Sequence, residues 1–171
     1  LGFDASTLEI WGPLLNGGCC VLHSEDLPTP AGLAATIASA GATTAWLTAA
    51  LFNAVVDDDP RHLSGLRELL IGGEALSVAH VRRLLVAAPG VTLINGYGPT
   101  ESTTFATTWR IPVPAADARS VPIGKPITDT ETLVLGPGME LLPTGVVGKL
   151  YVGGRGLALG YLNRPELTAE R

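Results

Sequence analysis

Residues 66–94 read LRELLIGGEALSVAHVRRLLVAAPGVTLI, a segment of helical periodicity between two short apolar runs. The runs at 66–71 and 91–94 have the length and composition of buried strands. Between them, apolar residues recur at the spacing of one helix face: Val78, Val81, Leu84 and Leu85. A strand, a helix and a strand in this order are typical of a crossover between parallel strands. We therefore predict a parallel sheet with helices packed on it.

The segment before residue 66 continues this alternation of helices and strands. The sequence Ser-Thr-Leu-Glu at residues 6–9 has the pattern of a capping box, which predicts a helix from there to residues 17–18. The elements expected after it are a strand at 19–23, a helix from Pro30 to Ser39, a strand at 42–47, and a helix that Thr48 caps and that ends near Val56.

The second half of the chain has a different pattern. Strands are predicted at 103–109, 130–135 and 148–152, with turn-rich sequence between them and few helix signals. The expected fold class is α/β, with a mostly parallel sheet and flanking helices followed by an antiparallel or partial β-barrel region. Residues 168–171 resemble the start of a helix and residue 1 is not methionine, so residues 1–171 are expected to be one partial domain of a longer protein.

Composition restricts the classes of function. A chain of 171 residues suits about one domain, and 46% hydrophobic with 16% charged residues excludes an intrinsically disordered protein. The net charge of -5, with no basic cluster larger than Arg82–Arg83, argues against a nucleic-acid partner. The uncharged segment 27–56 is interrupted by proline and glycine, so no membrane span is expected. The first residues show no basic region and no cleavage signal, so we expect a cytoplasmic location.

Other polar residues offer weaker candidates. The adjacent Cys19 and Cys20 are expected to be free, buried thiols, because neighbouring cysteines bridge only through a strained ring. The acidic run 57–59 closes a predicted helix, precedes Pro60 and is expected to be a solvated loop rather than a metal cluster. The three histidines are scattered and lack a Ser or Cys partner in a nucleophile motif, which disfavours a hydrolase triad.

The strongest candidate site is the run Asn-Gly-Tyr-Gly-Pro-Thr-Glu at residues 95–101, directly after a predicted strand. Open parallel sheets bind ligands at the carboxyl ends of their strands. The glycines permit close approach of a ligand to the backbone, and Tyr97 offers a flat face. Thr100 adds a hydroxyl group, and Glu101 adds oxygen ligands of the kind that Mg²⁺ prefers. This combination indicates a ligand site rather than a plain loop.

Two further positions remain open at this level. The run Gly72-Gly73-Glu74 follows another predicted strand and is either a tight turn or part of a site. Asp4 precedes a helix that Ser6 is expected to cap, so its carboxylate is either structural or needs another partner. No phosphate loop of the GxxxxGK[ST] type occurs in the chain.

Three stretches resemble the core motifs of adenylation domains of nonribosomal peptide synthetases, in the adenylate-forming superfamily. They are Phe-Asp-Ala-Ser at 3–6, the run at 95–101, and the stretch from GKLYVGG at 148–154 through LALGYL at 157–162. Their order and spacing match over essentially the whole chain. The resemblance implies part of the large N-terminal subdomain, with the phosphate loop before residue 1 and the small domain with its catalytic lysine after residue 171.

The resemblance also implies a reaction and its partners. An amino acid and ATP would form an aminoacyl-adenylate and pyrophosphate with the help of Mg²⁺. The acyl group would then pass to the phosphopantetheine thiol of a carrier protein domain in the same polypeptide. By the same resemblance, Thr100 and Glu101 are catalytic, Glu101 ligates magnesium, and Asp4 pairs with the substrate ammonium. The nucleotide would contact Gly73, Glu74, Asn95, Tyr97, Gly98 and Thr100.

The pocket wall that the resemblance implies is almost entirely apolar: Ala5, Leu8, Trp46, Leu70, Gly72, Gly96, Thr104 and Phe105. Such a wall favours a small branched side chain, and we predict valine ahead of isoleucine and leucine. Two alternatives stay open. One is an acyl- or aryl-CoA ligase of the same superfamily, which would not need Asp4; the other is a non-catalytic fragment that only binds substrate.

Overall fold

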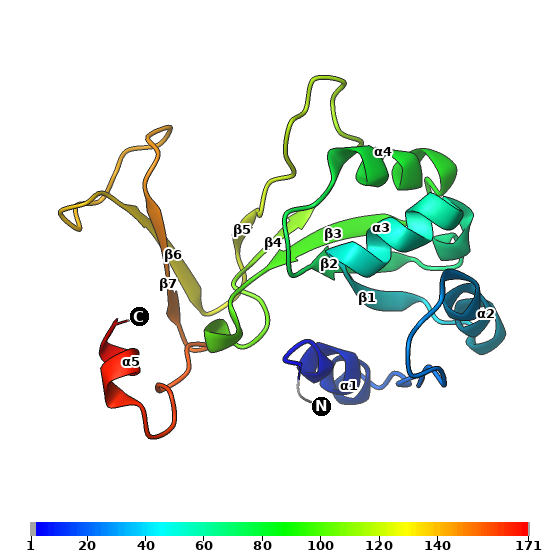
Figure 1. Cartoon of the computed structure of the whole chain (residues 1–171), viewed down its shortest axis with the longest axis horizontal. Helices are drawn as coiled ribbons and strands as arrows, with labels where there is room; N and C mark the ends of the chain where they lie inside the picture. The colour runs from blue at the N-terminus through cyan, green and yellow to red at the C-terminus, as the bar shows by residue number, and fades with distance from the viewer. Residues whose placement is uncertain (1–2, 171) are drawn as a thin grey trace.

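The computed structural model describes residues 3–170 and has an α/β fold built on one five-stranded sheet (Figure 1). The strands follow the order β1-β2-β3-β4-β5. The first three strands run parallel, and β4 and β5 add antiparallel to β3. Their bounds are β1 Thr44–Thr48, β2 Glu68–Gly72, β3 Thr92–Tyr97, β4 Thr107–Arg110 and β5 Lys125–Pro126. The predicted parallel sheet and its antiparallel continuation are confirmed.

Helices α3 (Ala49–Asp58) and α4 (Val78–Ala87) cover one face of the sheet (Figure 1). The core lies between them and the strands, where side chains from both layers exclude water. Its largest fully buried side chains include Phe52, Leu69, Ile71, Leu84 and Leu93. On α4 three residues of the predicted stripe, Val81, Leu84 and Leu85, are buried, and the fourth, Val78, is half-buried. Burial of this apolar stripe stabilises the crossover between β2 and β3.

The other face of the sheet is half-buried and lies above α1 (Ser6–Leu15) (Figure 1). The ring of Phe3 packs against Trp46 of β1 with a centroid distance of 5.3 Å. Helix α2 (Pro30–Ala40) and the 3₁₀ turn η1 (Pro60–Leu63) complete this part of the molecule. One sheet therefore separates a fully packed core from a face that remains partly open.

Local capping signals correctly placed two of the helices. The Thr29 hydroxyl accepts a hydrogen bond from Gly32 N at 3.1 Å, directly before α2, which Gly41 ends. The Thr48 hydroxyl accepts from Leu51 N at 3.1 Å at the start of α3. Each cap satisfies a main-chain N–H group that the first turn of a helix leaves without an intrahelical partner.

Three of the local predictions were wrong. The cap position of α1 is Ala5, with no side-chain capping bond, so Ser6 lies inside the helix instead of capping it. Residues 19–23 form no strand, because no neighbouring strand pairs with them. Residues 103–105 form a turn, and β4 begins only at Thr107. The cysteines are free, as predicted, but Cys19 is exposed and Cys20 only half-buried.

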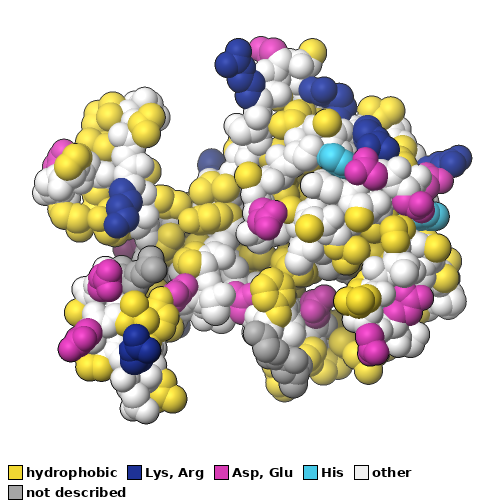
Figure 2. Space-filling model, in the orientation of Figure 1, with side chains coloured by type: hydrophobic (Ala, Val, Ile, Leu, Met, Phe, Trp, Pro, Cys, Tyr) yellow, Lys and Arg dark blue, Asp and Glu magenta, His cyan; other side chains and the backbone are white. Residues whose placement is uncertain are grey.

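A two-stranded antiparallel sheet follows, formed by β6 (Thr130–Leu135) and β7 (Lys149–Gly154). Within residues 3–170 these strands pair with no other strand, although Leu135 of β6 forms one isolated antiparallel bridge with Leu141, and the described strands close no barrel. Helix α5 (Pro165–Glu170) lies beside them (Figure 1). Hydrophobic side chains are exposed over the β6–β7 arm, on the left of Figure 2, and include Leu141, Val146 and Val147. Each helix in residues 3–170 is too short or too polar to span the hydrocarbon core of a bilayer.

Candidate functional site

Strand register gathers four of the predicted pocket residues on one face of the sheet. Trp46 pairs with Leu70 in adjacent strands, and Gly72 pairs with Gly96. Because side chains alternate along a strand, these four positions face the α1 side, away from the α3–α4 core. Ile94 pairs with Leu70 on the same face and was missed by sequence reasoning, although the alternation within β3 pointed to it.

Gly96 and Phe105 are in close contact on this face. A Cβ atom at position 96 would collide with the Phe105 ring, which therefore lies directly against the strand. Phe105 follows a turn in which Thr103 and Thr104 have φ angles of 56° and 75°. This left-handed conformation costs energy for β-branched residues, so the surrounding contacts must hold it. The turn directs the aromatic ring onto the strand.

Thr104 joins this turn to the segment before α1. Its side chain is buried, and its Oγ1 donates a hydrogen bond to the main-chain oxygen of Asp4 at 3.0 Å. Asp4 is half-buried and Ala5 is 1% exposed. Asp4 lies in the turn before α1, and Leu8, in the first turns of α1, is half-buried. Within residues 3–170 the Asp4 carboxylate forms no ion pair with a basic side chain.

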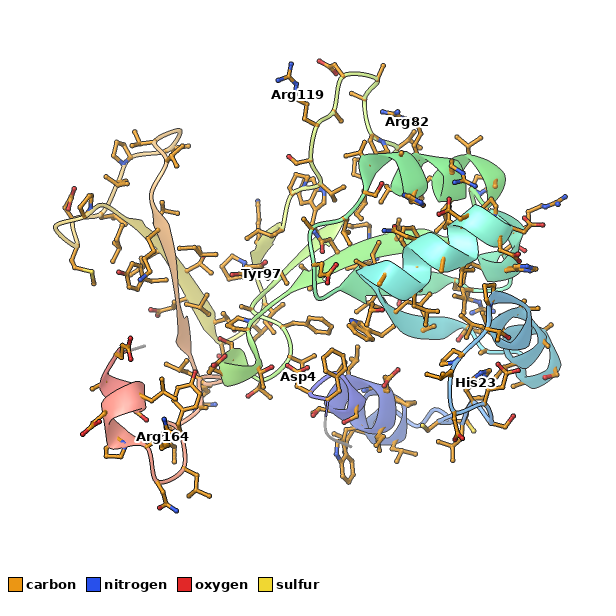
Figure 3. All side chains as sticks on the ribbon, viewed as in Figure 1. Asp4, His23, Arg82, Tyr97, Arg119 and Arg164 are labelled. Atoms are coloured by element: carbon orange, nitrogen blue, oxygen red, sulfur yellow. The ribbon has the colours of Figure 1, made fainter. Side chains whose placement is uncertain are left out.

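The run 95–101 is divided between strand and turn. Residues 95–97 still belong to β3, and residues 100–102 form the 3₁₀ turn η2 (Thr100–Ser102). The buried side chain of Asn95 donates from Nδ2 to the main-chain oxygen of Pro122 at 2.9 Å. Tyr97 is 37% exposed and lies, like Asp4, toward the end of the sheet at which the parallel strands finish (Figure 3). Both candidate regions thus share one edge of the sheet.

The remaining predicted residues border this edge with different accessibility. Gly73 and Glu74 follow β2 and are exposed, as is Thr100 at the start of η2. Gly98 is half-buried between Tyr97 and η2. The exposed positions leave main-chain and hydroxyl groups accessible to a ligand at the ends of the parallel strands, where such sheets bind nucleotides.

Glu101 contacts a segment that is distant in sequence. Its Oε1 accepts a hydrogen bond from the hydroxyl group of Tyr161. The main-chain oxygen of Glu101 also accepts from Ala158 N at 2.7 Å. The Thr103 hydroxyl donates to the main-chain oxygen of Gly156 at 2.7 Å. The loop of residues 155–161 is therefore attached to η2 at three points, a set of contacts that sequence reasoning missed.

The donor chemistry at Glu101 fits a magnesium ion bound together with a nucleotide. Mg²⁺ is usually held by one or two carboxylates, substrate phosphates and water. Glu101 is half-buried and supplies such a carboxylate next to the exposed Thr100 hydroxyl. No three His, Cys, Asp or Glu side chains in residues 3–170 form a metal-binding group by themselves.

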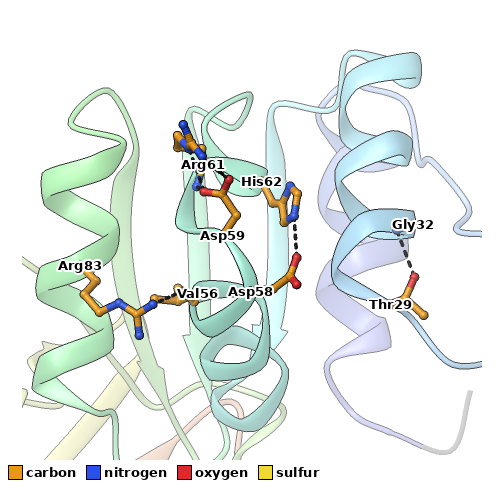
Figure 4. A network of polar contacts seen from close by, with 8 residues as sticks. All are labelled: Thr29, Gly32, Val56, Asp58, Asp59, Arg61, His62 and Arg83. Carbon is orange, nitrogen blue, oxygen red and sulfur yellow. Dashed lines mark hydrogen bonds and ion pairs between the residues drawn. The ribbon is translucent and has the colours of Figure 1, made fainter.

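The acidic run 57–59 closes α3, as predicted, and Asp57 and Asp58 are exposed to solvent. Each of the three carboxylates also has a basic partner, which the sequence did not indicate. Asp58 contacts His62 at 2.8 Å, and Asp59 binds Arg61 at 2.7 Å (Figure 4). Asp57 binds Arg83 at 2.6 Å, and hydrogen bonds from Arg83 and from His80 hold its pKa below the ordinary value. The run fastens α3 to η1 and α4.

His80 lies between a serine and an aspartate at the junction of α3 and α4. Its Nδ1 lies 2.7 Å from the Ser77 hydroxyl and its Nε2 lies 3.1 Å from Asp57 Oδ1. Arg83 shares the same carboxylate oxygen at 2.6 Å. These contacts link the start of α4 to the end of α3, on the face of the sheet opposite the predicted pocket residues.

Comparison with known proteins agrees with this architecture. The sequence model of one family, AMP-binding enzyme, matches residues 1–162. Tyrocidine synthase 3 of Brevibacillus parabrevis is 44% identical over 172 residues, which are 100% of this chain and 3% of that protein. Malpibaldin synthetase of Mortierella alpina is 49% identical over 98% of this chain and 3% of its own length.

A solved structure shares the fold closely. PA1221, an NRPS protein containing adenylation and PCP domains, superposes with a TM-score of 0.93 at 48% sequence identity, over 97% of this chain and 34% of its own. The chain thus spans about a third of that structure and a far smaller part of the curated relatives. Because the family match extends over residues 1–162, this chain belongs to the AMP-binding enzymes.

Proposed function

We propose that this chain forms the substrate- and nucleotide-binding part of an adenylation domain that activates an amino acid. The observation that carries the proposal is the hydrogen bond from Thr104 to the main chain of Asp4. It fixes the main chain of Asp4 beside a residue of the proposed pocket wall, and Asp4 lies toward the same end of the sheet as Tyr97 (Figure 3). An ammonium group, an apolar side chain and a nucleotide can then be bound side by side. The similarity to PA1221, described as an NRPS protein with an adenylation domain, supports this proposal.

The proposed reaction converts ATP and an amino acid into an aminoacyl-adenylate and pyrophosphate. Gly73, Glu74, Asn95, Tyr97 and Gly98 would border the nucleotide. Thr100 would lie beside the phosphates, and Glu101 would hold Mg²⁺. The bound ion would neutralise charge on the phosphate oxygens. The Asn95 amide, which already binds Pro122, would act mainly by keeping the adjoining backbone in place.

The amino-acid pocket is proposed to prefer valine over isoleucine and leucine. The Asp4 carboxylate would bind the α-ammonium group through a charge-assisted hydrogen bond. Thr104 is the one polar side chain of the wall, and its hydroxyl donates to Asp4 instead of to a ligand. The wall therefore presents mostly apolar atoms, and the Phe105 ring against Gly96 limits its depth. Both features favour a short, branched aliphatic side chain.

We further propose that the acyl group passes to the phosphopantetheine thiol of a carrier protein domain in the same polypeptide. PA1221, which contains adenylation and PCP domains, supports this partner. The structure of holo-PA1221 bound to a vinylsulfonamide inhibitor has a TM-score of 0.95 over 99% of this chain and 30% of its own, at 47% identity. Residues 1–171 would be one part of the adenylation domain, with the phosphate loop and the small C-terminal domain elsewhere in the longer protein.

An aryl-acid substrate is the second candidate. The Klebsiella oxytoca NpsA N-terminal subdomain, 30% identical with a TM-score of 0.90 over 100% of this chain and 42% of its own, is described in complex with 3-hydroxybenzoyl-AMSN. An aryl acid has no ammonium group for Asp4 to bind. The half-buried Asp4 carboxylate thus favours an amino acid.

ATP–pyrophosphate exchange by the full-length protein tests the proposal. Valine, isoleucine, leucine, fatty acids and aryl acids would be compared at equal concentration. We expect pyrophosphate exchange with valine and weaker exchange with isoleucine and leucine. Preference for an aryl or fatty acid would overturn the amino-acid proposal, and binding of valine without any exchange would favour a non-catalytic role.

A further inference from the structure

We propose that Tyr161 is a positioning residue that orients the Glu101 carboxylate for the metal ion, an inference that rests on the proposed function. The Tyr161 hydroxyl donates a hydrogen bond to Glu101 Oε1, and both side chains are half-buried. The two residues are 60 positions apart in sequence. Tyr161 therefore acts on the metal site through Glu101, from a separate part of the chain.

The hydrogen bond leaves the carboxylate able to bind a cation. An ionised carboxylate has two oxygens with about four acceptor sites, and Tyr161 uses one of them. Mg²⁺ requires near-ideal octahedral geometry, so a carboxylate with a restricted orientation loses less freedom when it becomes a ligand. Residues that bind a metal ligand in this way commonly change metal affinity or activity by about 10- to 100-fold when they are replaced.

The main chain of Tyr161 is itself fixed by α5. Its N–H group donates to the Thr168 hydroxyl at 2.9 Å, and its carbonyl oxygen accepts from Arg164 N at 3.0 Å. The Thr168 hydroxyl in turn donates to the Arg164 carbonyl oxygen at 3.1 Å. These bonds hold the backbone from which the phenol ring extends. The hydroxyl group therefore reaches Glu101 from an anchored position.

The loop does not depend on the Tyr161 hydroxyl for its attachment to η2. Ala158 N binds the Glu101 carbonyl oxygen, and the Thr103 hydroxyl binds the Gly156 carbonyl oxygen. A Cβ atom at Gly156 would lie only 2.9 Å from the Ser102 oxygen, so the two backbones are in close contact there. Removal of the hydroxyl in Tyr161→Phe should thus remove this restraint on the carboxylate and leave the loop in place.

The test uses the full-length protein and a readout that does not depend on turnover. Mn²⁺ binding in the presence of ATP would be measured by the loss of the free Mn²⁺ signal in electron paramagnetic resonance. We expect Tyr161→Phe to weaken Mn²⁺ binding by about 10- to 100-fold. In pyrophosphate exchange, the Mg²⁺ concentration for half-maximal rate should rise by a similar factor, while the KM for the amino acid stays unchanged.

Tyr151→Phe is the matched control, because Tyr151 lies in β7 and is not the tyrosine that binds Glu101. Its ring centroid lies 5.2 Å from Lys149 Nζ. We expect this variant to bind Mn²⁺ like the wild type. Glu101→Gln should lose Mn²⁺ binding, and Tyr161→Phe should add no further loss in the double variant. Such non-additive loss is the signature of two residues that act together.

Three results would overturn the positioning role. Unchanged Mn²⁺ binding in Tyr161→Phe, with loss in Glu101→Gln, would reject Tyr161 and leave Glu101 as a ligand. A large drop in the Tm of Tyr161→Phe, together with a loss of metal-free ATP binding as large as its loss of Mn²⁺ binding, would show that Tyr161 has only a structural role. Unchanged Mn²⁺ binding in both variants would reject the metal role of Glu101 as well, and with it this part of the proposed function.

Discussion

The Thr104 hydroxyl donates a hydrogen bond to the main-chain oxygen of Asp4 across a separation of 100 residues. It connects the strained turn before β4 to the start of α1. Both ends of the bond adjoin the proposed amino-acid pocket. The position of the Asp4 carboxylate therefore depends on a residue that would also form the pocket wall.

Thr104→Val should weaken substrate binding by moving Asp4. Valine is also β-branched, so the strain at φ 75° is retained while the hydroxyl donor is lost. The lost hydrogen bond corresponds to about 1 kcal/mol, or roughly a 5-fold higher KM for the amino acid. Steady-state exchange kinetics measure this change. Thr104→Ser keeps the donor and serves as control; an equal defect in both variants would contradict the role of the hydrogen bond.

Asp4→Ala should discriminate between an amino acid and a simple carboxylic acid. Removal of one partner of a buried charge pair costs about 3–5 kcal/mol, so kcat/KM for valine should fall by roughly two to three orders of magnitude. The measurement compares valine with 3-methylbutanoic acid, which lacks the ammonium group. The analogue should lose much less. Equal losses for both compounds would show that Asp4 has a structural role.

Trp46→Ala should enlarge the pocket and shift preference toward bulkier side chains. The large indole ring shares its face of the sheet with Leu70, and its replacement leaves space that only a larger substrate fills. In the wild type, one methylene is worth about 1–3 kcal/mol, so valine should exceed isoleucine by about 10- to 200-fold at most. Ratios of kcat/KM for valine, leucine and phenylalanine measure the shift. A preference of the wild type for charged side chains would contradict the assigned wall.

Asp59→Asn should make stability less dependent on acid pH. Hydrogen bonds from the Arg61 side chain and main chain lower the pKa of Asp59 from 3.8 to about 2. The folded state thus favours the ionised carboxylate, and this stabilisation is present above pH 3.8 and disappears as the pH falls to about 2. In denaturant unfolding, the free energy of unfolding of Asp59→Asn should be lower than that of the wild type at neutral pH. The two values should become equal as the pH falls to about 2.

Arg61→Met provides the control for this prediction. Without the guanidinium group, Asp59→Asn should have a smaller effect, although the main-chain N–H of residue 61 still donates to the carboxylate at 2.9 Å. A pH-independent difference between wild type and Asp59→Asn would mean that the ion pair does not contribute to the stability.

Elements with strong local signals were predictable from sequence. Thr29 and Thr48 cap helices that begin where the sequence indicated, because a cap depends only on residues within one turn. The apolar run at 19–23 also resembled a strand, but a strand exists only where another strand supplies its hydrogen bonds. Ser6 resembled a cap, yet the cap position of α1 is Ala5, one residue earlier.

The sequence indicated which residues form the candidate site, but not the contacts that hold them together. The run 95–101 and Asp4 stood out by residue type, and the pocket wall followed from the family resemblance. The bonds between Thr104 and Asp4 and between Tyr161 and Glu101 join residues that no local pattern connects. Such contacts depend on how distant segments pack, and they became visible only in the folded chain.

Strand β3 contributes side chains both to the core and to the proposed pocket, which limits how the amino-acid selectivity of this domain can be changed. Leu93 faces the core, while Ile94 and Gly96 face the opposite side of the sheet. An insertion or deletion of one residue within this strand would exchange the two faces and expose the core. Substrate range can therefore be redesigned by single substitutions at alternate positions of β1, β2 and β3, whereas changes in length belong in the loops beyond their carboxyl ends.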